Sequence, residues 1–273
     1  MIKIKVFLDS ADIVEIEKVK EMGILEGLTT NPSLIKKAAE KYKIKDMSIY
    51  IKKILRLCRG LPVSLEVIGS DYKTIVKEGE ILYKKFNKVA GNVYVKIPVN
   101  LCLNPNCDKA SDGIKAIKYF SKKKIPINCT LIFTPEQSML ASKAGASFVS
   151  PFVGRMDDYI RETSHIKFDK LDYYPEKGFK KGKKLLNDKG IVSGVDLIVE
   201  TRKIFDKQKI KKTKILAASI RNKRQFREVA EAGADIATVP FSVITTLLTH
   251  PKSSEGMKKF VKDIVPEYKN VLK

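Results

Sequence analysis

Short apolar segments, each followed by a stretch with the spacing of an amphipathic helix, recur eight times along this chain of 273 residues. Strands that alternate with helices in this way form a parallel sheet with right-handed crossovers, and eight such units favour a closed barrel. The sequence therefore predicts an α/β fold, a single (β/α)8 TIM barrel. The expected strands are VFLD (6–9), GLTT (27–30), VSLEV (63–67), VYVKIP (93–98), INCTLIF (127–133), FVSPF (148–152), ILAAS (215–219) and IATVP (236–240).

The chain length lies within the range of one barrel, so we predict a single domain over residues 1–273. Residues 159–192 interrupt the pattern with charges, tyrosines and glycines. We interpret them as an insertion after the sixth strand, because so short a segment would hardly sustain a core of its own. A C-terminal helix is expected at about 254–265. The helices of the eight units are expected at 11–22, 33–57, 71–86, 111–122, 135–144, 194–207, 222–232 and 242–248.

The formal net charge of +22 raises the question of a nucleic-acid partner, because basic surfaces displace counterions from phosphates. The lysines are spread along nearly every expected helix, with no glycine-rich RNA-binding motif and no regular interleaving with aromatics. We therefore expect a solvated basic surface, including the dense run at 177–189, and no nucleic acid as a partner. No apolar run approaches the roughly 18 residues of a membrane span, and the N-terminus does not resemble a secretory signal. We expect no membrane partner and a cytoplasmic protein.

The four cysteines are too few and too scattered for a disulfide framework in a chain that can bury a large core. Cys102 and Cys107 form the only close pair, and a zinc site would need further ligands from distant parts of a chain with two histidines. We expect a loop with two free thiols and no metal.

Polar side chains follow the expected strands at their C-terminal ends, where barrel enzymes place their chemistry. Each has an ordinary structural explanation. Asp9 could cap a helix, and Asn31 could lie in a turn before Pro32. Glu66 could be a buried partner for Lys96, and the arginines could be surface charges. Every strand but the last supplies at least one member of the set, which comprises Asp9, Thr30, Asn31, Glu66, Lys96, Asn128, Thr130, Ser150, Arg155, Ser219 and Arg221.

Lys96 is the notable member, because it lies inside the apolar run VYVKIP. A lysine among two carboxylates, hydroxyls and arginines would stabilise a core poorly. In a partly dry pocket a lysine loses its proton more easily and can attack a carbonyl carbon to form a Schiff base. Asp9 and Glu66 would then move protons and activate a water. Arg155 and Arg221 would bind a phosphate.

Eight segments of the sequence resemble the transaldolase family, in the same order along the chain. They cover most of it apart from residues 100–110, residues 159–192 and the extreme C-terminus. The segments are FLDSAD (7–12), GLTTNPSLI (27–35), SLEV (64–67), VKIP (95–98), NCTLIFTPEQ (128–137), GASFVSPFVGRMDD (145–158), AASIRN (217–222) and GADIATVPF (233–241).

The resemblance implies an enzyme of the pentose phosphate pathway that uses no metal or organic cofactor. Such an enzyme moves a dihydroxyacetone unit from a ketose phosphate, such as fructose 6-phosphate or sedoheptulose 7-phosphate, to an aldose phosphate. Lys96 matches the family's Schiff-base lysine and Asp9 its acid/base aspartate. Glu66 and Thr130 match the residues that hold the catalytic water. The donor contacts match Asn31, Asn128 and Ser150, and the phosphate site matches Arg155, Ser219 and Arg221.

Two alternatives remain open. In the related fructose-6-phosphate aldolases, the glutamate is typically glutamine and the phenylalanine of SPF is typically tyrosine. Glu66 and Phe152 therefore place this sequence on the transferase side. A non-catalytic barrel that binds polyanions through its basic surface is the second alternative, which the retained Lys96 disfavours. Related small transaldolases form rings, so the C-terminal helix could pack on a neighbouring copy or on its own barrel.

Overall fold

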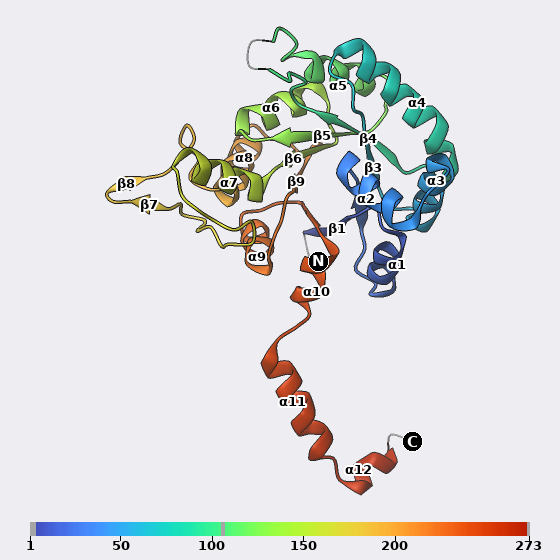
Figure 1. Ribbon diagram of the computed structural model, residues 1–273, viewed down its shortest axis with the longest axis vertical. Coiled ribbons are helices and arrows are strands. Elements are labelled where there is room, and N and C mark those ends of the chain that lie inside the picture. Colours follow the sequence, from blue (N-terminus) through green and yellow to red (C-terminus); the bar gives the residue numbers. More distant parts are fainter. Residues whose placement is uncertain (1–3, 105–106, 272–273) are drawn as a thin grey trace.

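Eight parallel strands close into a barrel in the computed structural model, which describes residues 4–104 and 107–271 (Figure 1). The (β/α)8 prediction is thus confirmed, and each expected strand overlaps an observed one. The first and last residues of the predicted domain, and two residues of the loop after β4, lie outside the described part. The barrel strands are β1 (Lys5–Asp9), β2 (Gly27–Thr29), β3 (Val63–Glu66), β4 (Val93–Pro98), β5 (Ile127–Ile132), β6 (Phe148–Pro151), β9 (Lys214–Ala217) and β10 (Ile236–Val239).

Helices surround these strands (Figure 1), and their ends follow local capping chemistry. The predicted helix at 33–57 is two helices, because Lys43 adopts a left-handed conformation with φ of 48° and Asp46 caps a new helix through its carboxylate. The helices of the barrel units are α1 (Ile13–Glu21), α2 (Pro32–Tyr42), α3 (Met47–Leu57), α4 (Tyr72–Ala90), α5 (Asp112–Lys122), α6 (Pro135–Ala144), α7 (Val153–Thr163), α8 (Gly194–Lys207), α9 (Lys223–Glu231) and α10 (Phe241–Leu247).

Alternate side chains of each strand face the barrel interior. Phe7, Tyr94 and Phe148 belong to an apolar cluster in which the Tyr94 and Phe148 rings stack with centroids 4.7 Å apart. Gly27 leaves room for this cluster, because an added Cβ would lie 2.4 Å from ring carbons of Phe7. The residues two positions later on the same strands are Asp9, Lys96 and Ser150. Because every second residue of a strand faces inward, the barrel interior changes from an apolar layer to a polar layer at the C-terminal ends of the strands.

The chain after β6 differs from the sequence prediction. It forms α7 before the extended segment 164–193, in which the short strands β7 (Lys180–Lys181) and β8 (Lys184–Leu185) make a projecting hairpin (Figure 1). Met156 and Ile160 of α7 are buried four residues apart, but charged neighbours conceal this helical spacing in the sequence. Both residues pack in one cluster with Tyr174, Leu186 and Ile191 of the segment and with Leu197 of α8.

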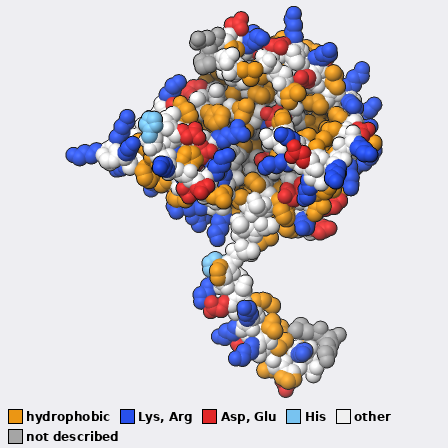
Figure 2. Space-filling model, viewed as in Figure 1, with side chains coloured by type: hydrophobic (Ala, Val, Ile, Leu, Met, Phe, Trp, Pro, Cys, Tyr) orange, Lys and Arg blue, Asp and Glu red, His pale blue; other side chains and the backbone are white. Residues whose placement is uncertain are grey.

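The C-terminal region forms α11 (Pro251–Lys262) and α12 (Pro266–Val271), which extend away from the barrel (Figure 1). The expected helix is therefore present. It begins earlier, where the His250 side chain caps it and Pro251 starts the first turn. No described residue of either helix is buried, so packing on the chain's own barrel is not what the structure shows. Figure 2 shows hydrophobic side chains on the surface of this arm, which we define as residues 251–271.

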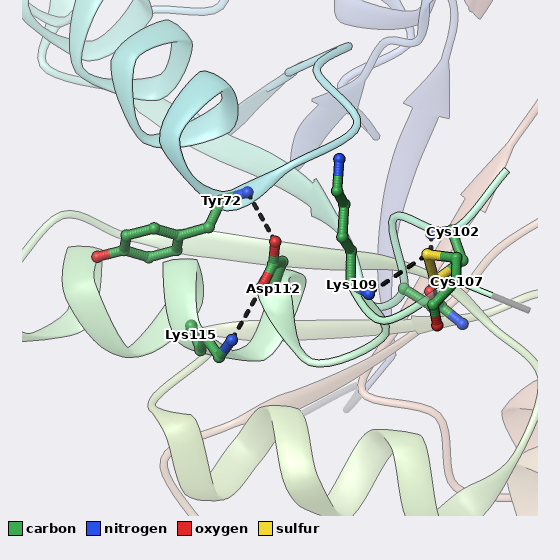
Figure 3. Close-up of a disulfide and its surroundings, with 7 residues drawn as sticks. Tyr72, Cys102, Cys107, Lys109, Asp112 and Lys115 are labelled. Atoms are coloured by element: carbon green, nitrogen blue, oxygen red, sulfur yellow. Dashed lines mark hydrogen bonds and ion pairs between the residues drawn. A yellow bond between two sulfur atoms is a disulfide. The ribbon is translucent and has the colours of Figure 1, made fainter.

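Cys102 and Cys107 form a disulfide in the loop between β4 and α5, so the prediction of two free thiols is wrong (Figure 3). Their Cα atoms lie 5.7 Å apart, which is within the range that a disulfide spans. The loop is also held by a hydrogen bond from Cys102 N to Asn100 Oδ1 of 2.9 Å. Sequence spacing alone could not reveal this disulfide, because the path of the loop decides whether the two side chains point toward one another.

Among residues 4–104 and 107–271, no helix combines the length and apolar composition that a membrane crossing requires.

Candidate active site

Lys96 and Glu66 form an ion pair inside the C-terminal end of the barrel. The register of β3 and β4 places them opposite one another, with Lys96 Nζ 3.0 Å from Glu66 Oε2. Their side chains are only 6% and 11% exposed. Lys96 Nζ also donates a 2.9 Å hydrogen bond to the carbonyl oxygen of Thr30. The lysine is thus held in one place by a carboxylate and a carbonyl, with little water around it.

A chain of hydrogen bonds fixes the amide of Asn128 beside this pair. Asn128 is opposite Lys96 in the register of β4 and β5. Its Oδ1 accepts from Ser150 Oγ at 2.6 Å, and its Nδ2 donates to Ser64 Oγ at 3.0 Å. Thr130, two residues further along β5, is fully buried, and its Oγ1 has no hydrogen-bond partner among the described residues. A buried hydroxyl of this kind needs a partner, so it suits contact with a water or a substrate.

Asp9 lies at the end of β1 and accepts a 2.7 Å hydrogen bond from Thr29 Oγ1. The hydroxyls of Thr29 and Thr238 are in turn 2.5 Å apart. Burial raises the pKa of Asp9, while the charges of Lys96 and Arg155 and the bond from Thr29 oppose this shift. The carboxyl therefore holds a proton more readily than an exposed aspartate. The helix that follows β1 is capped by Asp12, so a capping role for Asp9 is excluded.

Arg155 and Arg221 line one depression of about 590 Å³, together with Phe133 and Asp158. Arg155 is exposed and lies over the ring of Phe152, with 5.2 Å between the guanidinium carbon and the ring centroid. Arg221 makes a bidentate ion pair with Asp158. It also donates a 3.1 Å hydrogen bond to the carbonyl oxygen of Lys170, in the segment after α7. Two guanidinium groups on one depression suit the binding of a phosphate.

Ser219 and Asn31 have backbone-related roles in the structure. Ser219 has a left-handed φ of 61°, and its carbonyl oxygen accepts a 3.1 Å hydrogen bond from Gly154 N. An added Cβ at Gly154 would lie 2.6 Å from that oxygen, so α7 can approach this turn only with glycine there. Asn31 caps α2, its Oδ1 accepting from Leu34 N at 3.0 Å. It lines a second depression of about 400 Å³ together with Glu66.

The structure thus joins Lys96 to Glu66 and Asn128 to Ser150 by direct contacts, and the register of β4 and β5 places the two pairs side by side. It also brings Asp9 close enough for its charge to interact with Lys96. The arrangement offers an amine nucleophile, a buried acid and two guanidinium groups, of which Arg221 is also paired with Asp158. Within the described ranges, no three side chains of His, Cys, Asp or Glu come together as a metal site would require.

The sequence prediction missed Ser64, Thr29 and Thr238, which complete the polar network. Thr238 lies on the last barrel strand, so that strand does supply a polar residue, contrary to the prediction. The sequence did contain a sign of this residue. Thr238 is a polar residue in an otherwise apolar strand, and it lies two positions after Ile236, so both side chains face the barrel interior. The pairing of Asp158 with Arg221 joins residues 63 positions apart and had no local signal.

Comparison with known proteins shows relatives over nearly the whole chain. The family described as Transaldolase/Fructose-6-phosphate aldolase matches residues 6–271. A protein of Leptospira biflexa named "Probable transaldolase" is 40% identical over 257 residues, which cover 94% of this chain and 96% of that one. A protein of Thermoplasma acidophilum with the same name is 38% identical over 271 residues, or 98% and 100% of the two chains.

Proposed function

Because the chain belongs to the transaldolase/fructose-6-phosphate aldolase family, we propose that it is a transaldolase of the pentose phosphate pathway in the cytoplasm. It would transfer a dihydroxyacetone unit from fructose 6-phosphate or sedoheptulose 7-phosphate to an aldose phosphate. The observation that carries the proposal is the buried pair of Lys96 and Glu66, with 3.0 Å between Nζ and Oε2. It places an amine beside an acid where a ketose carbonyl can enter.

In the first step, Lys96 Nζ adds to the C2 carbonyl carbon of the donor. Loss of that oxygen as water then leaves a protonated Schiff base. Glu66 is placed to exchange the protons of this step, because its carboxylate already touches the amine. Thr130 Oγ1, which has no partner in the described structure, would hold the departing water. Asn128 would orient the hydroxyls of the donor's carbon chain through its fixed amide.

In the second step, the carboxylate of Asp9 takes the proton of the donor's C4 hydroxyl. The C3–C4 bond then breaks, its electron pair moves toward the iminium carbon, and an aldose phosphate leaves. The raised pKa of Asp9 suits this role, because a stronger base accepts that proton more readily. The enamine that remains then attacks the acceptor aldehyde, and Asp9 returns the proton to the new hydroxyl. Water then adds to the iminium carbon of the product, the C–N bond breaks, and the ketose phosphate leaves Lys96 as a free amine. Arg155 and Arg221 would hold the phosphate of the donor and of the acceptor in turn.

The test is covalent capture. Fructose 6-phosphate with borohydride should leave a reduced dihydroxyacetone unit on Lys96, located by peptide mass spectrometry. Lys96→Met should abolish the adduct. Lys115→Met is the matched control, because Lys115 is an exposed lysine on α5 that pairs with Asp112, and this variant should label like the wild type. Labelling that persists in Lys96→Met would refute the assignment.

We also propose that the arm packs on a second copy of the chain. Met257, Phe260 and Val261 of α11 are 60–72% exposed, and the last two lie three and four residues after Met257, so the three form one apolar stripe. An uncovered stripe of this kind marks a protein interface. Light scattering after size exclusion should show an oligomer for the full chain and a monomer after removal of residues 251–273. Equal oligomeric states for both would contradict the proposal.

A further inference from the structure

The two adjacent carboxylates Asp157 and Asp158 both serve the arginine at position 221, but by different routes. Asp158 contacts the guanidinium itself. Asp157 lies behind it, 2% exposed, and reaches only the backbone of Arg221 through a second side chain, Gln225. We propose that Asp157 and Gln225 are positioning residues that fix Arg221 for phosphate binding, an inference that rests on the proposed function and specifies its phosphate site.

Asp157, the first of the two positioning residues, joins three helices. It lies on α7, its Oδ1 accepts from Gly194 N at the start of α8 at 2.7 Å, and its Oδ2 accepts from Gln225 Nε2 on α9 at 2.8 Å. Burial raises the pKa of Asp157 to about 7, while the bonds from Gly194 and Gln225 and the charges of Arg161 and Arg221 oppose that shift. Tyr174 is the other titratable group that faces it.

The second positioning residue is Gln225, which is also 2% exposed. Its Oε1 accepts a 2.9 Å hydrogen bond from Arg221 N. Because that N–H can only donate, the amide oxygen must face Arg221 and the amide nitrogen must face Asp157. The orientation of Gln225 is therefore determined at both ends, and with it the backbone from which the Arg221 side chain leaves the barrel.

The same turn is held from its other side by Gly154, whose N–H donates to the Ser219 carbonyl. An added Cβ at Gly154 would lie 2.7 Å from Arg221 Nε, so the guanidinium stem rests directly on this helix. Residues 154–158 thus contact the turn at 219–221 in three ways: at its backbone, at the side-chain stem of Arg221 and at the Arg221 guanidinium. An arginine fixed in this way loses less conformational freedom when a phosphate binds.

The experiment exchanges the partners of one hydrogen bond. Asp157→Asn turns an amide nitrogen toward the amide nitrogen of Gln225 and loses the contact. Gln225→Glu turns a carboxylate toward Asp157, and the contact is lost once both carboxylates are ionised, so all variants are compared well above pH 7. The double variant, Asp157→Asn with Gln225→Glu, restores the bond in reverse, because the amide introduced at position 157 donates to the carboxylate introduced at position 225. The remaining oxygen of each new side chain can still accept from Gly194 N or from Arg221 N.

The readout is calorimetric titration of the full chain with inorganic phosphate. One buried hydrogen bond is worth up to about a factor of ten, so if its loss acts on the position of Arg221, each single variant should bind phosphate up to about tenfold less tightly and the double within about twofold of wild type. Steady-state kinetics should show the same change in KM for fructose 6-phosphate and little change with unphosphorylated donors.

The matched control is Asn92→Leu, which removes a buried amide that donates to the Leu55 and Cys58 carbonyls at the opposite end of β4. It should lower the melting temperature without changing phosphate affinity. The proposal is overturned if the single variants bind phosphate like wild type, or if the folded double variant binds as weakly as the singles. Should Asp157→Asn not fold, Gln225→Glu and the double variant carry the comparison. Failure of the wild type to form the borohydride adduct would refute the proposed function instead, since phosphate titration does not depend on catalysis.

Discussion

Replacing Lys96 by methionine should test the chemistry and the stability of the site together. The substitution matches the lysine side chain as far as Cε but lacks Nζ, which at 3.0 Å is the only ion-pair partner of Glu66 among the described residues. It leaves a carboxylate that is 11% exposed. Breaking a buried ion pair by removing one partner destabilises a protein by about 3–5 kcal/mol, because the remaining charge is uncompensated. For a chain of this length the melting temperature falls by about 2 °C per kcal/mol, so a drop of roughly 6–10 °C is expected.

The double variant Lys96→Met, Glu66→Leu should recover most of this loss, because it removes both charges and leaves an apolar pair in their place. Both variants should lack activity. The measurement is thermal and denaturant unfolding at neutral pH, followed by circular dichroism. The prediction would be refuted if the Lys96→Met protein were as stable as wild type at neutral pH, or if the double variant were no more stable than the single. Either result would show that the buried charge of Glu66 does not need Lys96 to compensate it.

Three further predictions concern the phosphate site and the outcome of the reaction. Arg221→Ala should raise KM for phosphorylated sugars by about tenfold or more and leave turnover of unphosphorylated donors nearly unchanged, whereas equal losses with both would contradict the phosphate role. Phe152→Tyr adds one phenolic hydroxyl to the ring that lies under Arg155, so it should increase release of free dihydroxyacetone without an acceptor, measured by coupled assay. An unchanged ratio of release to transfer would count against the transferase assignment. Burial raises the pKa of Asp157 to about 7, so below that pH the carboxyl is protonated and one of its oxygens no longer accepts freely. Arg221 is then held less well, and inhibition by sulfate, an anion of the same shape as phosphate, should weaken as the pH falls through 7. This dependence should be absent in Asp157→Asn, and its persistence there would exclude Asp157 as the titrating group.

The strands and most helices of the barrel could be predicted from the sequence, because their periodicity is local. The observed β4 and α6 begin and end where the sequence indicated. The two failures have local causes as well. A left-handed residue at Lys43 divides one predicted helix, and the charged residues of α7 conceal the buried positions Met156 and Ile160.

The site was predictable to the extent that strand ends converge in a barrel. Lys96, Glu66 and Asn128 are neighbours because adjacent parallel strands place them in register. What the sequence could not indicate are contacts whose partners are far apart along the chain, such as those of Gln225 with Asp157. The disulfide was missed for a different reason, since it depends on the path of a loop.

The arm has a consequence for how the molecule scatters X-rays. A compact chain of 273 residues has a radius of gyration of about 18–19 Å. Helices α11 and α12 place mass well beyond the barrel (Figure 1), so a single chain in this shape should exceed that value and show a long tail in its distribution of interatomic distances. When the arm packs on another copy, the same long distances fall within a larger compact particle and no longer form a separate tail. The shape of the distribution therefore reports where the arm lies without any change to the sequence.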